Sequence, residues 1–209
     1  MLSAHQALQR LREGNRRFAS NEAVASSLDN TVRRASLLAG QEPFAVILGC
    51  SDSRVPAELV FDQGFGDLFV IRVAGNIVAP SQVGSVEFAA SRYGTRLVIV
   101  MGHSQCGAVL ATLEELQGRA TSQSRNLRSI VDRVRPSVET VLASRRASDG
   151  DALLHDAVRA NVRAAANQLR HGSELLESLA RENGLCVIGA EYSLETGIVD
   201  FFDGAPNTG

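Results

Sequence analysis

The sequence predicts an α/β fold in which helices flank a mostly parallel central sheet of four parallel strands plus an antiparallel edge strand. Two observations predict this fold: short apolar runs rich in β-branched residues recur along the chain, and helical patterns separate most of them. Such runs are typical of strands that are buried on both faces of a parallel sheet. We therefore expect strands and helices to alternate around one core.

Five segments are expected to form the strands. The four parallel strands are predicted over residues 44–49, 68–73, 97–101 and 185–188. Residues 198–202 follow Thr196-Gly197 closely enough to form a hairpin with the fourth strand, which predicts an antiparallel edge.

The helices are predicted from apolar residues that recur at three- and four-residue intervals. Ala4, Ala7, Leu8 and Leu11 have this spacing near the N-terminus. Further helices are expected over residues 84–93, 107–116, 126–144 and 151–179, with Gly172-Ser173 splitting the last, while residues 204–209 are expected to be loose.

Composition limits the classes of function. With 209 residues, 44% of them hydrophobic, the chain can bury one substantial core, so we expect a single domain over residues 1–209. A net charge of -2 argues against a nucleic-acid partner. No apolar stretch approaches the length of a membrane span and no signal-peptide core is evident, so we expect a cytoplasmic protein with no membrane partner.

The three cysteines are odd in number and irregularly spaced, which favours metal binding or catalysis over a disulfide framework. Two segments place metal-capable side chains directly after predicted strands: Cys50-Ser51-Asp52-Ser53-Arg54 and His103-Ser104-Gln105-Cys106-Gly107. Ligands of open parallel sheets bind beyond the carboxyl ends of the strands. If the first and third strands are neighbours, two thiolates and one imidazole meet there and leave a fourth tetrahedral position, as in a catalytic zinc site.

Asp52 is the expected occupant or neighbour of that fourth position, and Arg54 could hold its carboxylate through a bidentate pair. A single cysteine at a strand end is more often a small core residue than a ligand. Cys186 lies within the predicted fourth strand with no histidine or acidic neighbour, so we assign it to the core. A cysteine hydrolase that uses Cys106 and His103 would leave Cys50 unexplained.

These residues resemble a known family, because C-S-D-S-R-V together with G-H-S-Q-C-G is similar to the paired signature of β-carbonic anhydrases. The resemblance extends over most of the chain and includes Arg72-Val73-Ala74-Gly75-Asn76. It implies that Cys50, His103 and Cys106 bind Zn²⁺ and that Asp52 and Arg54 form a catalytic dyad. The implied reaction is the reversible hydration of carbon dioxide to bicarbonate through zinc-bound hydroxide, and Asp52 would itself bind zinc only in a closed state at lower pH.

The resemblance also implies a set of substrate-binding residues: Gln41, Phe69, Phe88 and Gly107. In this family the apolar pocket is completed by a neighbouring subunit, so a homo-oligomer is expected, a dimer or a dimer of dimers, with the N-terminal helix packing on the partner. Some relatives bind bicarbonate at a non-catalytic pocket that contains tryptophan. Ile47 stands at the matching position of this sequence, so that pocket is expected to be absent or altered.

Two other functions stay open at this point. A hydrolase of carbonyl sulfide or carbon disulfide would use the same zinc site. A non-catalytic zinc-binding relative would keep the fold for assembly, but such a protein would need neither the Asp52-Arg54 pair nor Gln41.

Overall fold

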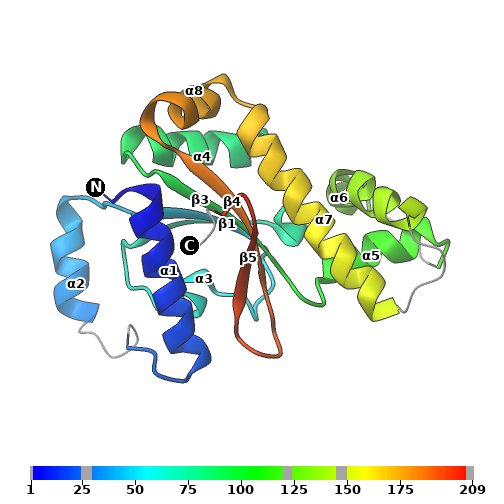
Figure 1. Cartoon of the computed structure of the whole chain (residues 1–209), viewed down its shortest axis with the longest axis horizontal. Helices are drawn as coiled ribbons and strands as arrows, with labels where there is room; N and C mark the ends of the chain where they lie inside the picture. The colour runs from blue at the N-terminus through cyan, green and yellow to red at the C-terminus, as the bar shows by residue number, and fades with distance from the viewer. Residues whose placement is uncertain (1, 25–29, 120–123, 145–149, 206–209) are drawn as a thin grey trace.

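Five strands form one sheet in the computed structural model, which describes residues 2–24, 30–119, 124–144 and 150–205 (Figure 1). They are β1 (Ala45–Gly49), β2 (Leu68–Arg72), β3 (Leu97–His103), β4 (Cys186–Tyr192) and β5 (Val199–Asp203). The order across the sheet is β2-β1-β3-β4-β5, and only the pair between β4 and β5 is antiparallel among these strands. The predicted fold class is confirmed, including the adjacency of the first and third strands.

Two strands are longer than the sequence pattern predicted. The prediction ended the third strand at Met101 and the fourth at Ile188, but the pairing of β3 with β4 continues to His103 and Tyr192. These extra positions include the polar His103 and Glu191, which interrupt the apolar run although both are buried. His103 is therefore the last residue of a strand and does not follow it.

The helices surround this sheet. They are α1 (Ala4–Ala19), α2 (Asn30–Ser36), α3 (Ala57–Val60), α4 (Pro80–Arg92), α5 (Gly107–Leu116), α6 (Arg125–Ser144), α7 (Gly150–His171) and α8 (Glu174–Asn183), with short 3-10 turns η2 (Leu37–Ala39) and η3 (Ala74–Asn76). The split at Gly172-Ser173 is confirmed, because Ser173 caps the start of α8. The short helices α2 and α3 were not predicted, and α4 starts earlier than expected because Pro80 opens its first turn. None of the described helices has the length and hydropathy to cross a bilayer.

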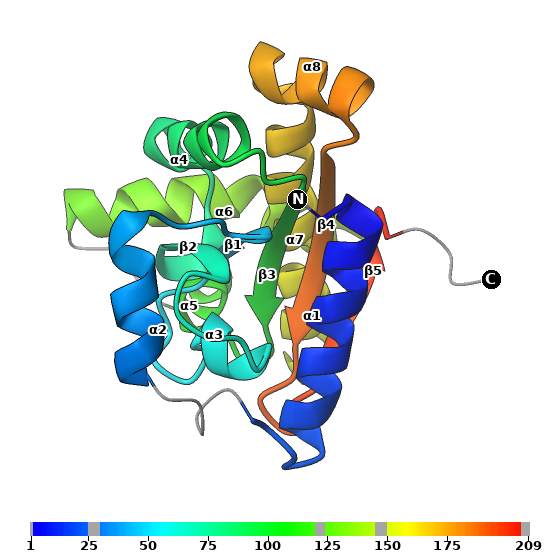
Figure 2. The ribbon, with the colours of Figure 1, turned by 90° about the vertical axis from the view of Figure 1, so that its left-hand side faces the viewer.

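Both faces of the sheet are covered, as Figure 2 shows with α1 in front of β4 and α7 behind it. On one face, α1 and α3 pack on the side chains of Ile47, Ile99 and Ile188. On the other, α4, α7 and α8 pack on Val46 and Val98. Successive side chains of each strand point to opposite faces of the sheet, and each face is covered by its own layer of helices.

The apolar face of helix α1 packs against the sheet of its own chain. Ala7, Leu8 and Leu11 are fully or almost fully buried against the sheet, and a capping box between Ser3 and Gln6 starts the helix. The expected packing of this helix on a partner subunit stays a prediction, and it would have to use the opposite, polar face of α1.

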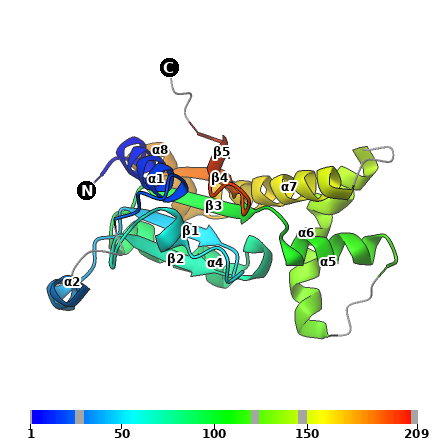
Figure 3. The ribbon, with the colours of Figure 1, turned by 90° about the horizontal axis from the view of Figure 1, so that it is seen from below.

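A third layer lies beyond the carboxyl ends of the strands. Helices α5 and α6 stand at the end of the molecule opposite α2 (Figure 3). Together with α7 they enclose a buried cluster that includes Cys50 and Cys106. The fold therefore carries both cysteine side chains into the helical layer next to the strand ends.

Candidate metal centre

Cys50, His103 and Cys106 meet at the carboxyl ends of β1 and β3. Cys50 directly follows β1, His103 ends β3, and Cys106 is the N-cap residue of α5. Their potential ligand atoms all lie within 4.8 Å of one another, and all three residues are buried. Because β1 and β3 are paired in parallel, residues far apart in the sequence leave the sheet at the same edge.

The ring of His103 is oriented for ligation. Its Nδ1 lies 2.9 Å from the backbone oxygen of Ser104, which fixes the proton on Nδ1 because a carbonyl only accepts. Nε2 is then the nitrogen with a free lone pair, and it has no hydrogen-bond partner in the described part of the chain although it is buried. Metal-binding histidines commonly show this pattern, with one nitrogen held by a carbonyl and the other directed at the ion.

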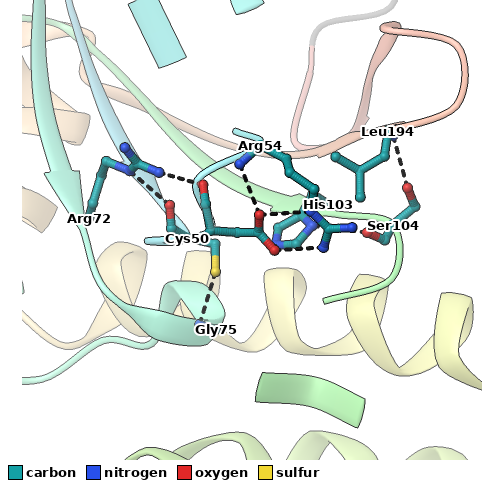
Figure 4. A network of polar contacts seen from close by, with 8 residues as sticks. Cys50, Arg54, Arg72, Gly75, His103, Ser104 and Leu194 are labelled. Carbon is teal, nitrogen blue, oxygen red and sulfur yellow. Dashed lines mark hydrogen bonds and ion pairs between the residues drawn. The ribbon is translucent and has the colours of Figure 1, made fainter. Parts of the chain in front are cut away.

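The two thiols share a polarised environment. A hydrogen bond from Cys106 lowers the pKa of the Cys50 thiol to about 4 against the opposing effect of burial, and His103 and the backbone N–H of Gly75 add to the lowering. The Gly75 nitrogen lies 3.4 Å from the Cys50 sulfur (Figure 4). The same interaction with Cys50, together with burial, raises the pKa of Cys106. The protein itself therefore favours the thiolate form of Cys50. A bound divalent cation would favour the thiolate form of Cys106 as well.

Asp52 lies next to this group and is held by Arg54. Arg54 donates from Nε to Oδ1 at 2.9 Å and from Nη2 to Oδ2 at 2.7 Å, and its backbone N–H donates to Oδ1 at 3.0 Å. These hydrogen bonds hold the pKa of the Asp52 carboxyl well below its usual range. Oδ2 of Asp52 is 3.8 Å from Nε2 of His103, so the carboxylate borders the ligand group while facing the guanidinium.

The donor set fits a metal ion. Two sulfurs and one imidazole nitrogen, buried and mutually close, are ligands typical of a borderline-soft divalent cation. Three protein ligands leave a further coordination position for a small molecule. This group can therefore hold a metal with one side open toward Asp52.

The expected substrate residues separate into two places. Gly107 follows Cys106 at the start of α5 and therefore lies beside the group of Cys50, His103 and Cys106. Phe69 pairs with Val46 near the amino end of β1, three register positions before the Gly49–Arg72 pair. Its ring packs against those of Phe88 and Tyr93 at centroid distances of 6.3 and 6.2 Å.

Gln41 joins this aromatic cluster by donating from Nε2 to the Tyr93 hydroxyl at 3.0 Å. Within one chain, Gln41, Phe69 and Phe88 therefore lie toward the amino ends of the strands, away from the metal group. Tyr93 was not predicted as a member of this cluster, because its place is set by the turn after α4 and not by a motif.

Two residues around the metal group were also missed. The Ser104 carbonyl accepts from His103, and its hydroxyl accepts from the backbone N–H of Leu194 at 2.9 Å, which ties the ligand segment to the β4–β5 turn (Figure 4). Arg72 donates to the backbone of the segment that follows β1. The sequence pattern placed Arg72 inside a segment that carries the family resemblance, but it gave no sign of these backbone contacts.

Comparisons with known proteins agree with this geometry. The family model described as carbonic anhydrase matches residues 45–199. Carbonic anhydrase 2 of Mycobacterium tuberculosis is 37% identical over 95% of this chain and 93% of its own length, and the carbonic anhydrase of Mycolicibacterium smegmatis is 38% identical over 91% and 89%.

Solved structures give the same result. The β-carbonic anhydrase CafA of Aspergillus fumigatus superposes with a TM-score of 0.76 at 26% identity, covering 90% of each chain. The β-carbonic anhydrase CcaA superposes with a TM-score of 0.70 at 30% identity, covering 94% of this chain and 95% of its own. The sequence match and the shared architecture agree, and the chain belongs to the β-class carbonic anhydrase family.

Proposed function

We propose that this protein catalyses the reversible hydration of carbon dioxide to bicarbonate and a proton, with zinc as its metal. The observation that carries the proposal is the buried group of Cys50, His103 and Cys106 with the Asp52–Arg54 pair on its border. A purely structural metal site needs closed coordination and has no use for an oriented carboxylate beside it.

Cys50, His103 and Cys106 would hold the zinc ion through two sulfurs and Nε2. When bound by three protein ligands, zinc lowers the pKa of water toward neutrality and supplies a nucleophile at physiological pH. The buried Nε2 and the lowered pKa of Cys50 support this assignment, because ligation requires a neutral imidazole and thiolates.

Asp52 orients the reacting oxygen. As an ionised carboxylate it only accepts hydrogen bonds, so a hydroxyl near the ligand group must direct its proton at Asp52 and its lone pairs elsewhere. Arg54 donates hydrogen bonds to both carboxylate oxygens. This bidentate contact fixes the orientation of the carboxylate, and with it the direction from which Asp52 can accept a further hydrogen bond. This arrangement favours one orientation of a hydroxyl beside the ligand group, with its lone pairs directed away from Asp52.

The apolar part of the pocket comes from a second copy of the chain in this proposal. Gln41, Phe69 and Phe88 lie away from the metal group of their own chain, and Phe88 is half exposed. Other exposed apolar side chains occur on the segments that lead into β1 and β2: Val32, Leu38, Leu59 and Phe65. A homo-oligomer would cover this surface and would place an apolar wall for carbon dioxide opposite the metal.

We assign the reaction to the cytoplasm. The three cysteines are free in the structure, and two of them are needed as reduced ligands. A reducing compartment keeps such thiols available for metal binding.

The test replaces the oriented carboxylate and leaves the ligands intact. Asp52→Ala is expected to retain zinc and to lower carbon dioxide hydration by at least about 10- to 100-fold, because the metal keeps its ligands but the reacting oxygen loses its acceptor. Metal content and stopped-flow hydration are measured on the same preparation.

Cys186→Ser is the matched control, since Cys186 opens β4 outside the ligand group and should keep both zinc and rate. Wild-type hydration by zinc-loaded Asp52→Ala would contradict the assigned role. A wild-type protein that holds zinc but hydrates no carbon dioxide would contradict the proposed function.

A further inference from the structure

Arg72 lies beside the segment that carries the first metal ligand. It is the last residue of β2, and its register partner is Gly49, the last residue of β1. The chain continues from Gly49 directly into Cys50. The side chain of Arg72 thus starts from a hydrogen-bonded strand position next to the segment that leaves β1.

The guanidinium of Arg72 holds two backbone carbonyls of that segment. Nε donates to the carbonyl oxygen of Cys50 at 3.0 Å, and Nη2 donates to that of Asp52 at 2.5 Å (Figure 4). The Asp52 oxygen also accepts from the backbone N–H of Val55 at 3.0 Å. Both carbonyls are therefore fixed relative to one rigid plane that is anchored on the sheet.

This contact constrains the directions of two side chains. The carbonyls of Cys50 and Asp52 bracket Ser51, so holding both fixes the backbone torsions between them. Those torsions set where the Cys50 sulfur and the Asp52 carboxylate leave the chain. We infer that Arg72 is a positioning residue, whose backbone contacts hold Cys50 in the ligand group and Asp52 in reach of Arg54.

Arg54 and Arg72 have separate tasks in this arrangement. Arg54 donates to the carboxylate of Asp52, whereas both hydrogen bonds of the Arg72 guanidinium within the described residues go to main-chain oxygens. The Arg72 residue is exposed, so water can reach the two carbonyls when the guanidinium is removed. Loss of Arg72 is therefore expected to loosen the segment without unfolding the protein.

The first experiment measures metal affinity and needs no substrate. Apo protein is titrated with cobalt(II), and the thiolate charge-transfer absorption reports binding at the cysteines. Arg72→Ala is expected to weaken cobalt affinity by about 10- to 100-fold, as removal of a residue that orients a ligand does. Arg72→Lys is expected to fall in between, because an ammonium cannot reproduce the planar fork across two carbonyls.

Arg170 provides the matched control. It also donates from Nε and Nη2 to a backbone carbonyl, that of Val187, near the amino end of β4. Arg170→Ala and Arg170→Lys are expected to keep wild-type cobalt affinity. If folded Arg72→Ala binds cobalt as tightly as wild type, or if the Arg170 variants lose as much affinity, the inference is wrong.

A second measurement, which rests on the proposed function, tests whether Arg72 affects the hydration rate by positioning Asp52. At full zinc occupancy, Arg72→Ala should lower the hydration kcat in the wild-type background and have little effect in the Asp52→Asn background. An equal loss in both backgrounds would mean that Arg72 does not act through Asp52. A wild-type protein without hydration activity would overturn the proposed function, while the cobalt titration would still decide the role of Arg72.

Discussion

Arg54 determines which way the Asp52 carboxylate faces. Its guanidinium engages both oxygens, and Oδ2 remains 3.8 Å from His103 Nε2, so Asp52 borders the ligand group without joining it. This is the open arrangement of the two that the family resemblance implies. The same hydrogen bonds lower the pKa of Asp52. The carboxylate therefore stays ionised until the pH falls well below the ordinary pKa of an aspartic acid side chain.

The pH dependence of activity should therefore not come from protonation of Asp52. In Arg54→Ala the pKa of Asp52 rises toward its ordinary value of about 3.9, still below the assay range. We expect the hydration rate to fall by about 10- to 100-fold because the carboxylate loses its orientation. The shape of the profile between about pH 6.5 and 9 should stay that of the wild type.

Stopped-flow hydration across that range checks this expectation. Arg54→Lys serves as the conservative variant, with a smaller loss of rate and the same profile. A shift of the acid limb in Arg54→Ala would contradict this expectation: it would show that Asp52 takes part in the pH dependence, by titrating in the neutral range or by closing onto the metal.

The two halves of the proposed pocket lie at opposite ends of the sheet. The metal group sits where β1 and β3 end, whereas Gln41 and the aromatic cluster of Phe69, Phe88 and Tyr93 lie toward the strand starts. A single chain therefore does not bring its own Phe88 to its own metal. If these residues act in the reaction, two copies must share them.

Mixed dimers test this sharing. One chain carries Asp52→Ala, and the other carries Gln41→Ala with Phe88→Ala, two exposed positions whose change should not affect folding. If each site combines the metal group of one chain with Gln41 and Phe88 of the other, one site of the mixed dimer contains all three substitutions. The other site contains none. The mixed dimer should recover about half of the wild-type rate per dimer.

The reference for this experiment is the mean rate of the two parent homodimers. Mixed dimers that are isolated with two different affinity tags should exceed that mean clearly. A rate equal to the mean would place each complete site within one chain and would refute the shared pocket.

The sequence predicted those parts of the fold and the site that follow from the order of the strands and from the residues at their carboxyl ends. The β-branched runs identified β1 and β3, and parallel pairing then brought Cys50, His103 and Cys106 to one edge. The short helix α2 escaped prediction because its seven residues carry no apolar periodicity.

The contacts that orient the site were beyond the reach of sequence patterns. The Arg72 fork depends on the register between β1 and β2, and the Ser104 carbonyl depends on the direction of the His103 ring. Neither has a spacing signature, since both use backbone atoms that every residue possesses. Such contacts become visible only when side-chain directions are known.

The metal content of protein purified without chelators decides whether Cys50, His103 and Cys106 bind zinc. Elemental analysis is expected to find about one zinc ion per chain in the wild type and almost none in Cys50→Ser or Cys106→Ser, because each loses one of three protein ligands. Folded wild-type protein that hydrates carbon dioxide without any divalent metal, or full zinc content in both cysteine variants, would contradict the account.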